Sequence, residues 1–300
     1  MMRAVASMEN HHEYSEKQRI LVGTSGWSYP RGEGSWNGHF YPPGTKNELG
    51  YFSQFFSCVE INSSFYSPVN PAWASAWASK TPDGFVFTAK LWQKFTHPKM
   101  FETATGEAAA ISRDDVDLFL KGIEPLAAAG KLGAILAQFP PSFENTGGGR
   151  QTLEAVLKTF GDLPIAVELR HRSWSDDPAT AELLSAYDAA WVQTDEPRFS
   201  FSIARELPAT SERLAYFRFH GRNAADWWTG NNETRYRYLY SQQEIEELAG
   251  RVKTSAAAAE KTFVFFNNHW KAYAPRNAGD LIKALQLPFA GLPLLMPSQK

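Results

Sequence analysis

The chain contains 300 residues, of which 43% are hydrophobic, 14% aromatic and 21% charged, a composition typical of a globular protein rather than a disordered or fibrous one. The 30 Lys and Arg residues nearly balance the 32 Asp and Glu residues, which excludes binding to nucleic acid or an anionic membrane through overall charge. Cys58 is the single cysteine, so an intrachain disulfide is excluded. Because no apolar run resembles a membrane span or a signal peptide, we expect a cytoplasmic protein without a membrane partner.

Two parts of the chain differ in character. Residues 1–18 are polar and lack hydrophobic periodicity, so we expect a flexible N-terminal tail. Residues 19–300 contain no linker-like stretch and no break in composition, which predicts a single domain.

Short apolar, β-branched or aromatic runs recur along the chain and predict strands. There are eight such runs, at 20–25, 58–66, 85–90, 132–139, 164–170, 189–195, 214–221 and 262–269. Stretches with helical character lie between most of them, at 46–56, 71–79, 113–129, 151–160, 179–187, 242–259 and 277–287.

This alternation predicts the α/β class and a parallel sheet, and eight repeats in this length favour a closed (β/α)₈ barrel of the TIM type. The segment 197–213 has two prolines and little helical periodicity, so we expect a loop in place of the sixth helix. A doubly wound open sheet is the alternative fold. It would more naturally show a glycine fingerprint after the first strand, and GTSGW at 23–27 does not match one.

At the C-terminal ends of the predicted strands, polar residues occupy every second position. In the second, fifth and seventh strands the alternating polar residues are Glu60 and Asn62, Glu168 and Arg170, and Arg218 and His220. The other strands contribute Lys90, Gln138, Thr194 or Asp195, Asn267, Asn268 and His269. Since side chains alternate along a strand, the polar set is predicted to face the barrel axis at the end where barrel enzymes hold their active sites.

From these positions we predict roles. Glu168 is the first candidate for general acid or base, with Glu60 or Asp195 as its partner. Its replacement by Gln is expected to abolish activity while the melting temperature stays within a few degrees. The guanidinium groups of Arg170, Arg218 and Arg222 are candidates to hold an anionic group. The further candidates for substrate binding are Trp27, Asn62, Tyr66, Lys90, Gln138, His171, His220, Asn267, Asn268 and His269.

Alternatives remain open at several of these residues. The charges at the barrel mouth can instead form a structural ion-pair network. Lys90 is a candidate Schiff-base lysine, although an ion-paired structural lysine is the favoured interpretation. No cofactor is required by the sequence. A divalent metal held by the carboxylates and histidines of the mouth is a weaker alternative, because no compact metal-binding spacing is present. The many tryptophans that follow strands suit sugar rings or nucleobases, or pack a small core over the mouth.

Several blocks of the sequence resemble a known family, domain-of-unknown-function family 72, the YecE-like proteins. The blocks are GTSGW (23–27), Trp36 with FYP (40–42), VEINSSFY (59–66), FTAKLW (87–92), QFPPSF (138–143), VELRHRSW (167–174), FRFHGR (217–222), Tyr236 with Tyr238, and FNNH (266–269). The resemblance spans about residues 20 to 290. It implies a TIM-type barrel and no established activity, so it carries over no catalytic residue.

The sequence therefore predicts an enzyme of hydrolase or isomerase and lyase type that uses barrel-mouth carboxylates for acid–base chemistry. The expected partner is a small polar ligand that is sugar-like, nucleotide-like or phosphorylated. The alternative is a binding protein without turnover, for a nucleic-acid fragment or a protein partner. The oligomeric state is not predicted.

Overall fold

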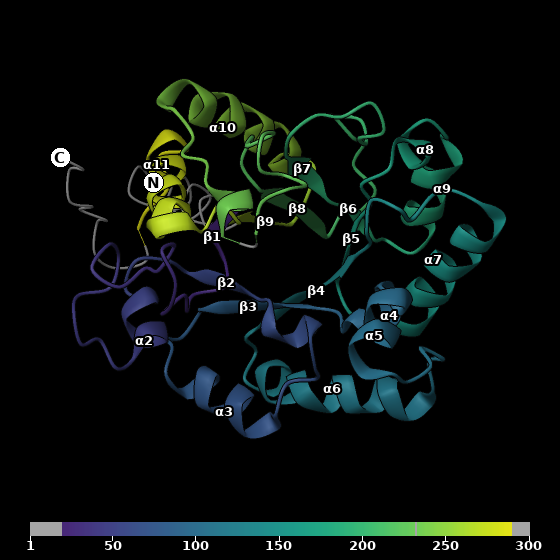
Figure 1. The fold of residues 1–300 in the computed structure, drawn as a ribbon, viewed down its shortest axis with the longest axis horizontal. Helices are drawn as coiled ribbons and strands as arrows, with labels where there is room; N and C mark the ends of the chain where they lie inside the picture. Colours follow the sequence, from purple (N-terminus) through teal and green to yellow (C-terminus); the bar gives the residue numbers. More distant parts are fainter. Residues whose placement is uncertain (1–19, 232, 290–300) are drawn as a thin grey trace, which may run out of the picture.

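The structure, a computed structural model, describes residues 20–231 and 233–289 (Figure 1). The predicted N-terminal tail, residues 1–18, lies outside these residues. No helix in the described part of the chain is long and apolar enough to cross a membrane.

The described residues form one parallel sheet. Its strands are β1 (Ile20–Ser25), β2 (Cys58–Ile61), β3 (Val86–Lys90), β4 (Leu132–Gln138), β5 (Ile165–Glu168), β6 (Ala190–Trp191), β7 (Gln193–Asp195), β8 (Leu214–Phe219) and β9 (Lys261–Phe266). Their order in the sheet is β6-β5-β4-β3-β2-β1-β9-β8-β7. Only Val192 separates β6 from β7 in the chain, so the two ends of the sheet meet and nearly close a barrel. Each predicted run supplies one strand, and the sixth supplies both β6 and β7.

Helices surround the barrel, as Figure 1 shows. They are α2 (Glu48–Phe52), α3 (Pro71–Ser79), α4 (Gln93–Thr96), α5 (Pro98–Thr105), α6 (Arg113–Ala128), α7 (Gly147–Phe160), α8 (Arg172–Ser175), α9 (Ala179–Ala186), α10 (Gln242–Ala256) and α11 (Tyr273–Ala284), with 3-10 turns η1 (Ser63–Phe65), η2 (Thr234–Tyr236) and η3 (Trp270–Ala272). No helix lies between β7 and β8, where residues 196–213 run as a loop. The predicted α/β barrel with a loop in place of its sixth helix is therefore confirmed.

The two faces of the strands carry different side chains. Outward-facing residues such as Val59, Val167 and Phe217 belong to the large core between the barrel and its helices. A second, smaller apolar cluster fills the barrel interior, and it consists of Cys58, Ala134, Leu136, Ala166, Ala190, Val192, Leu214, Tyr216, Phe263 and Phe265. Burial raises the pKa of the Cys58 thiol well above its ordinary value, which suits a packing role. The inward positions nearer the C-terminal ends are polar, so the interior changes from apolar to charged along the axis.

Candidate active site

A chain of ion pairs crosses the polar end of the barrel. The Arg218 guanidinium donates from Nε and Nη2 to the two oxygens of Glu60, at 3.0 and 2.8 Å, and from Nη1 to Glu168 Oε2 at 2.6 Å. In the sheet β1 and β9 separate β2 from β8, so Glu60 and Arg218 can meet only through the interior. All three side chains are almost completely buried. These residues meet because each occupies a strand position whose side chain faces the barrel axis, as the alternation in the sequence predicts.

Arg170 and His220 extend this network towards the opening. Arg170 donates from Nε to Glu168 Oε1 at 2.7 Å, and its Nη2 lies 3.2 Å from His220 Nε2. On the other side of the ring, His220 Nδ1 lies 3.1 Å from the Asn267 side-chain amide nitrogen. Burial, and then the nearby Arg170 charge, lower the pKa of His220 to about 3. His220 is therefore a neutral imidazole in this network.

Tyr216 joins the charged network to the apolar interior below it. Its hydroxyl donates to Glu60 Oε2 at 2.7 Å and lies 2.9 Å from the Thr88 hydroxyl. Its ring lies against Phe265 with centroids 5.3 Å apart. Glu60 is thus fixed by three donor atoms from two residues.

The network restricts what its members can do. Although burial alone would raise the pKa of Glu168, the Arg218 and Arg170 charges hold it well below its ordinary value. A carboxylate that remains ionised in this way is a poor proton donor. The guanidinium groups of Arg170 and Arg218 already bind carboxylates of the chain, so neither is free to bind an anionic substrate. Among the alternatives left open by the sequence, this geometry favours the structural ion-pair network for Glu60, Glu168 and Arg218.

Lys90 lies at the same mouth outside the network. Its ammonium group sits 3.9 Å from the centre of the Phe65 ring and makes no hydrogen bond or ion pair with any described residue. Burial and then the charge of Arg218 lower the pKa of Lys90 to about 7, against opposing contributions from Glu168 and Glu60. The ion-paired lysine favoured from the sequence is thus not what the structure shows.

Glu196 is a second charged residue of the mouth without a full set of partners, and it was not among the predicted site residues. Its Oε2 atom is buried and has no hydrogen-bond partner, and the nearest cation is Arg170 Nη1 at 3.6 Å. Burial is the largest influence on Glu196 and raises its pKa. Alternation in the sequence could not identify it alone. The register of β7 with β8 pairs Thr194 with the inward-facing Arg218, and Glu196 stands two residues after Thr194.

The structure places four predicted residues elsewhere. Asp195 is in register with Phe219 on the outward face, where it accepts hydrogen bonds from Arg222 and from Tyr240, both at distances of 2.8 to 2.9 Å. Asn268 donates to Asn277 on α11 at 2.9 Å, again outside the barrel. Trp27 packs against Trp77 of α3 with ring centroids 5.2 Å apart. Asp195, Arg222, Asn268 and Trp27 therefore do not join the charged mouth, because strand alternation turns them towards the helices or because they pack there.

Aromatic rings line part of the opening. His269 stacks on Tyr29 with centroids 4.5 Å apart, and Tyr236 lies 5.2 Å from His269. Asn62 is a hydrogen-bond partner of the Tyr29 hydroxyl. Tyr66 beside Phe65 is 65% exposed. Tyr29 and Tyr236 were not among the predicted site residues. Tyr29 lies in the loop directly after β1, and Tyr236 lies in the long loop after β8.

A second group of rings lies on the loops after β7 and β8. Phe199 and Phe201 stack with centroids 5.5 Å apart, and Trp228 packs at a tilt against both. His171, at the start of α8, lies parallel to Phe201 at 6.3 Å, while its Nδ1 atom contacts the Ser173 hydroxyl. We call Phe199, Phe201 and Trp228 the rim platform. Trp228 is 52% exposed, so the rim platform presents an apolar ring to solvent.

Two further observations complete the site. Gln138 is buried and donates to the backbone carbonyl of Phe139 at 2.7 Å, so its amide group is fixed at the end of β4. Across residues 20–231 and 233–289, no group of three or more His, Cys, Asp and Glu side chains is arranged to hold a metal ion.

A nearly closed (β/α)₈ barrel with a buried charged network, two incompletely partnered ionisable groups and aromatic loops defines the class of this protein. Residues 21–300 match the family described as "Protein of unknown function DUF72", and the chain belongs to this family. The resemblance seen in the sequence blocks is thereby confirmed.

Relatives of known sequence and structure agree. The UPF0759 protein YunF of Bacillus subtilis is 32% identical over 286 residues, which cover 91% of this chain and 97% of that protein. A crystal structure of a DUF72 family protein from Thermotoga maritima has a TM-score of 0.77 at 34% identity, covering 89% of this chain and 99% of that one. One from Enterococcus faecalis has a TM-score of 0.77 at 28% identity, covering 90% and 96%. None of these descriptions states an activity.

Proposed function

We propose that this chain is an enzyme that performs acid–base chemistry on a small polar molecule at the barrel mouth. Glu196 and Lys90 are the proton-transferring pair in this proposal, in place of Glu168 with Glu60 or Asp195. The observation that carries it is the contrast in partners. Glu60 and Glu168 are held by arginines, whereas Glu196 Oε2 and the Lys90 ammonium group have no hydrogen-bond partner in the described structure.

The surroundings of Glu196 favour its protonated form, whereas those of Lys90 favour its deprotonated form. The pKa of Glu196 is raised, so its carboxyl group keeps a proton to higher pH than an ordinary glutamate. The pKa of Lys90 is lowered to about 7, so at that pH the amine is neutral in about half of the molecules. Two titratable groups with environments of this kind are typical of an acid and a base that work together near neutral pH.

The rim supports a polar substrate with a flat or ring-shaped part. Tyr29, Tyr236 and His269 offer aromatic faces. The Asn62 amide lies beside Tyr29, and the Asn267 amide lies beside His220. These features suit a sugar-like or nucleotide-like molecule. Phosphate recognition is supported less well, because Arg170 and Arg218 are bound to carboxylates. A cytoplasmic location is part of this proposal, since such substrates are plentiful there.

The proposal is tested by incubating the purified protein with pooled sugars, sugar phosphates and nucleotides and following their loss by mass spectrometry. We expect turnover of one class, and a loss of at least about 100-fold in Glu196→Gln, the size of a typical acid–base contribution. Glu206→Gln is the matched control, because Glu206 is exposed on the same loop. Full turnover in a folded Glu196→Gln protein contradicts the proposed role. If nothing is turned over and short oligonucleotides alone raise the melting temperature, the chain is a binding protein instead.

A further inference from the structure

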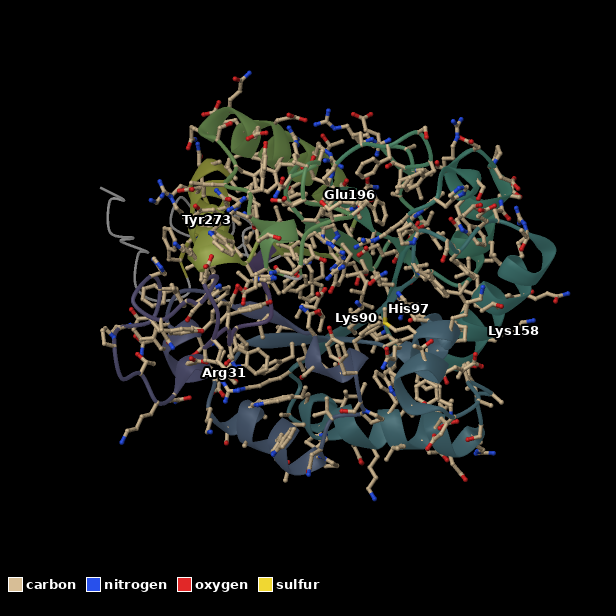
Figure 2. All side chains as sticks on the ribbon, in the orientation of Figure 1. Arg31, Lys90, His97, Lys158, Glu196 and Tyr273 are labelled. Carbon is tan, nitrogen blue, oxygen red and sulfur yellow. The ribbon has the colours of Figure 1, made fainter. Side chains whose placement is uncertain are left out.

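Lys90 differs from two other lysines, Lys94 and Lys131, in the contacts of its amine. Lys94, four residues later, donates to Asp115 at 2.8 Å. Lys131 is buried, but its ammonium group donates to the carbonyls of Ala78 and Thr81, each at 2.7 Å. Lys90 alone of these three has an amine with no hydrogen bond, at the inward end of β3 (Figure 2). Of these three lysines, Lys94 and Lys131 are structural donors, and Lys90 is available for chemistry.

The backbone of Lys90 is held while its amine is left free. The Ser64 hydroxyl lies 2.7 Å from the Lys90 carbonyl oxygen and 2.8 Å from the Ile61 carbonyl oxygen, so it joins the ends of β2 and β3. The Phe65 ring covers the Lys90 amine, and the His97 ring packs edge-on against Phe65 at 4.9 Å. Figure 2 shows Lys90 and His97 next to each other at the middle of the molecule. Removal of the amine from water disfavours its protonated form, whereas the face of the Phe65 ring attracts that form, and the balance of all influences lowers the pKa of Lys90 to about 7.

The groups that face Lys90 come from several elements. Arg218 on β8 and Arg170 after β5 disfavour its positive charge, while Glu168 and Glu60 favour it. The carboxylates are bound to the arginines, so their attraction for Lys90 is partly cancelled. His97 is neutral, since burial and the Lys90 charge lower its pKa to about 3. A lysine desolvated beside other cations is the known arrangement of an amine nucleophile.

We propose that Lys90 is a covalent nucleophile that forms a Schiff base, and that the substrate is therefore an aldehyde or ketone. The proposal rests on the proposed function and deepens it. It keeps the same mouth and keeps Glu196 as the proton donor, and it assigns the neutral Lys90 amine to attack on carbon instead of proton transfer. The neutral amine attacks the carbonyl carbon and the C=O π electrons move to oxygen. One proton then passes from the new ammonium nitrogen to that oxygen, which gives a neutral carbinolamine whose nitrogen again carries a lone pair. The carbinolamine hydroxyl then accepts a proton from the Glu196 carboxyl group and leaves as water, while the nitrogen lone pair forms the C=N bond. No oxidant or reductant is needed.

The test traps the imine with sodium cyanoborohydride in the intact protein, using glycolaldehyde and, separately, glyoxylate as probes. Reduction adds to the lysine the mass of the aldehyde less one oxygen atom, and peptide mapping locates it. At pH 7 we expect Lys90 to be labelled at least about tenfold faster than Lys94 or Lys131, because far more of its amine is neutral. The labelling rate of Lys90 should level off above about pH 7. The labelling rate of ordinary lysines should continue to rise up to about pH 10, because their amines lose the proton only there.

The outcomes separate this proposal from the proposed function. Labelling of Lys90 no faster than that of Lys94 and Lys131 overturns the covalent role, and since it is read in the unmodified chain, no variant has to fold. If Glu196→Gln loses turnover while Lys90 is not trapped, acid–base catalysis stands and the Schiff base does not. If Lys90 is trapped selectively but Glu196→Gln retains full turnover, the nucleophile stands and the assigned proton donor does not. Lys90→Arg, which keeps the charge but has no amine, should lose the label entirely.

Discussion

The barrel mouth holds two sets of charged residues that differ in how fully they are partnered. In the first, the Arg218 guanidinium binds Glu60 and Glu168, and every contact is made by side chains that are almost fully buried. In the second, Lys90 at the end of β3 and Glu196 after β7 each lie near Arg170. The Lys90 ammonium group and the Glu196 Oε2 atom lack hydrogen-bond partners. A buried ionisable group without partners costs more stability than one whose charge is paired. We therefore interpret the first set as built for the fold and the second for chemistry.

The largest expected effect comes from removing the centre of the paired set. Arg218→Met leaves Glu60 and Glu168 buried with their main cation gone, and we expect a loss of about 3–5 kcal/mol in the free energy of unfolding. Urea unfolding measures it. Arg172→Met, at a half-exposed pair with Asp176, is the control and should change stability by less than about 0.5 kcal/mol.

The Arg218 prediction can be sharpened by removing the partners as well. A triple variant with Glu60→Gln and Glu168→Gln added to Arg218→Met leaves no buried charge unpaired, so it should recover part of the lost stability. A triple variant less stable than Arg218→Met alone would show that the carboxylates are not penalised by the loss of Arg218.

The next effect concerns Glu168 and its dependence on pH. Its pKa in the folded protein is well below the unfolded value of about 4.3, so its contribution to stability is present above that pH and is lost as the pH falls below it. Glu168→Gln should therefore be less stable than the wild type by about 2–4 kcal/mol at pH 7. The difference in free energy of unfolding between the wild type and Glu168→Gln should become smaller as the pH falls from about 4 to about 2. Equal stability at pH 7 would contradict the assigned role.

This result would also replace the expectation drawn from the sequence, that Glu168→Gln keeps its melting temperature. The sequence shows a carboxylate at a strand end but not the two guanidinium groups bound to it. A catalytic and a structural carboxylate look alike until their partners are known.

The smallest effect on stability is expected for Lys90, in the incompletely partnered set. Its dependence on pH arises from a lowered lysine pKa, so Lys90 costs stability where Glu168 contributes it. The pKa of Lys90 in the folded protein, about 7, lies below the unfolded value of about 10.4, so the unfolded state binds more protons between these values. Stability of the wild type should rise with pH across that window. Lys90→Met should flatten this rise and should not destabilise the protein at pH 7. A marked loss of stability at pH 7 would place Lys90 with the structural residues.

Much of the fold and part of the site follow from strand alternation. The period of two in VEI and RFH predicts that Glu60, Arg218 and His220 share one face, and the eight runs predict the barrel that brings these faces together. These features depend only on local backbone geometry, so a single sequence suffices to find them.

The remaining parts of the site depend on three-dimensional contacts. Thr194, Asp195 and Glu196 are consecutive polar residues, and only the register of β7 with β8 shows which side of the barrel each one faces. Lys90 and Lys94 have the same side chain within one short segment, but only Lys94 finds a carboxylate. Tyr29 meets His269 across almost the whole length of the chain. No local pattern encodes these pairings.

Tyr216 connects the apolar interior of the barrel to the charged network at its mouth. One end of this side chain packs among the phenylalanines that fill the barrel, and the other end holds a Glu60 oxygen. A tyrosine is rigid between its ring and its hydroxyl, so any change in packing deep in the barrel displaces an atom of the charged network. Substitutions at Phe263 or Phe265, remote from solvent and from any substrate, thus become a means of adjusting the electric field at Lys90 from a distance.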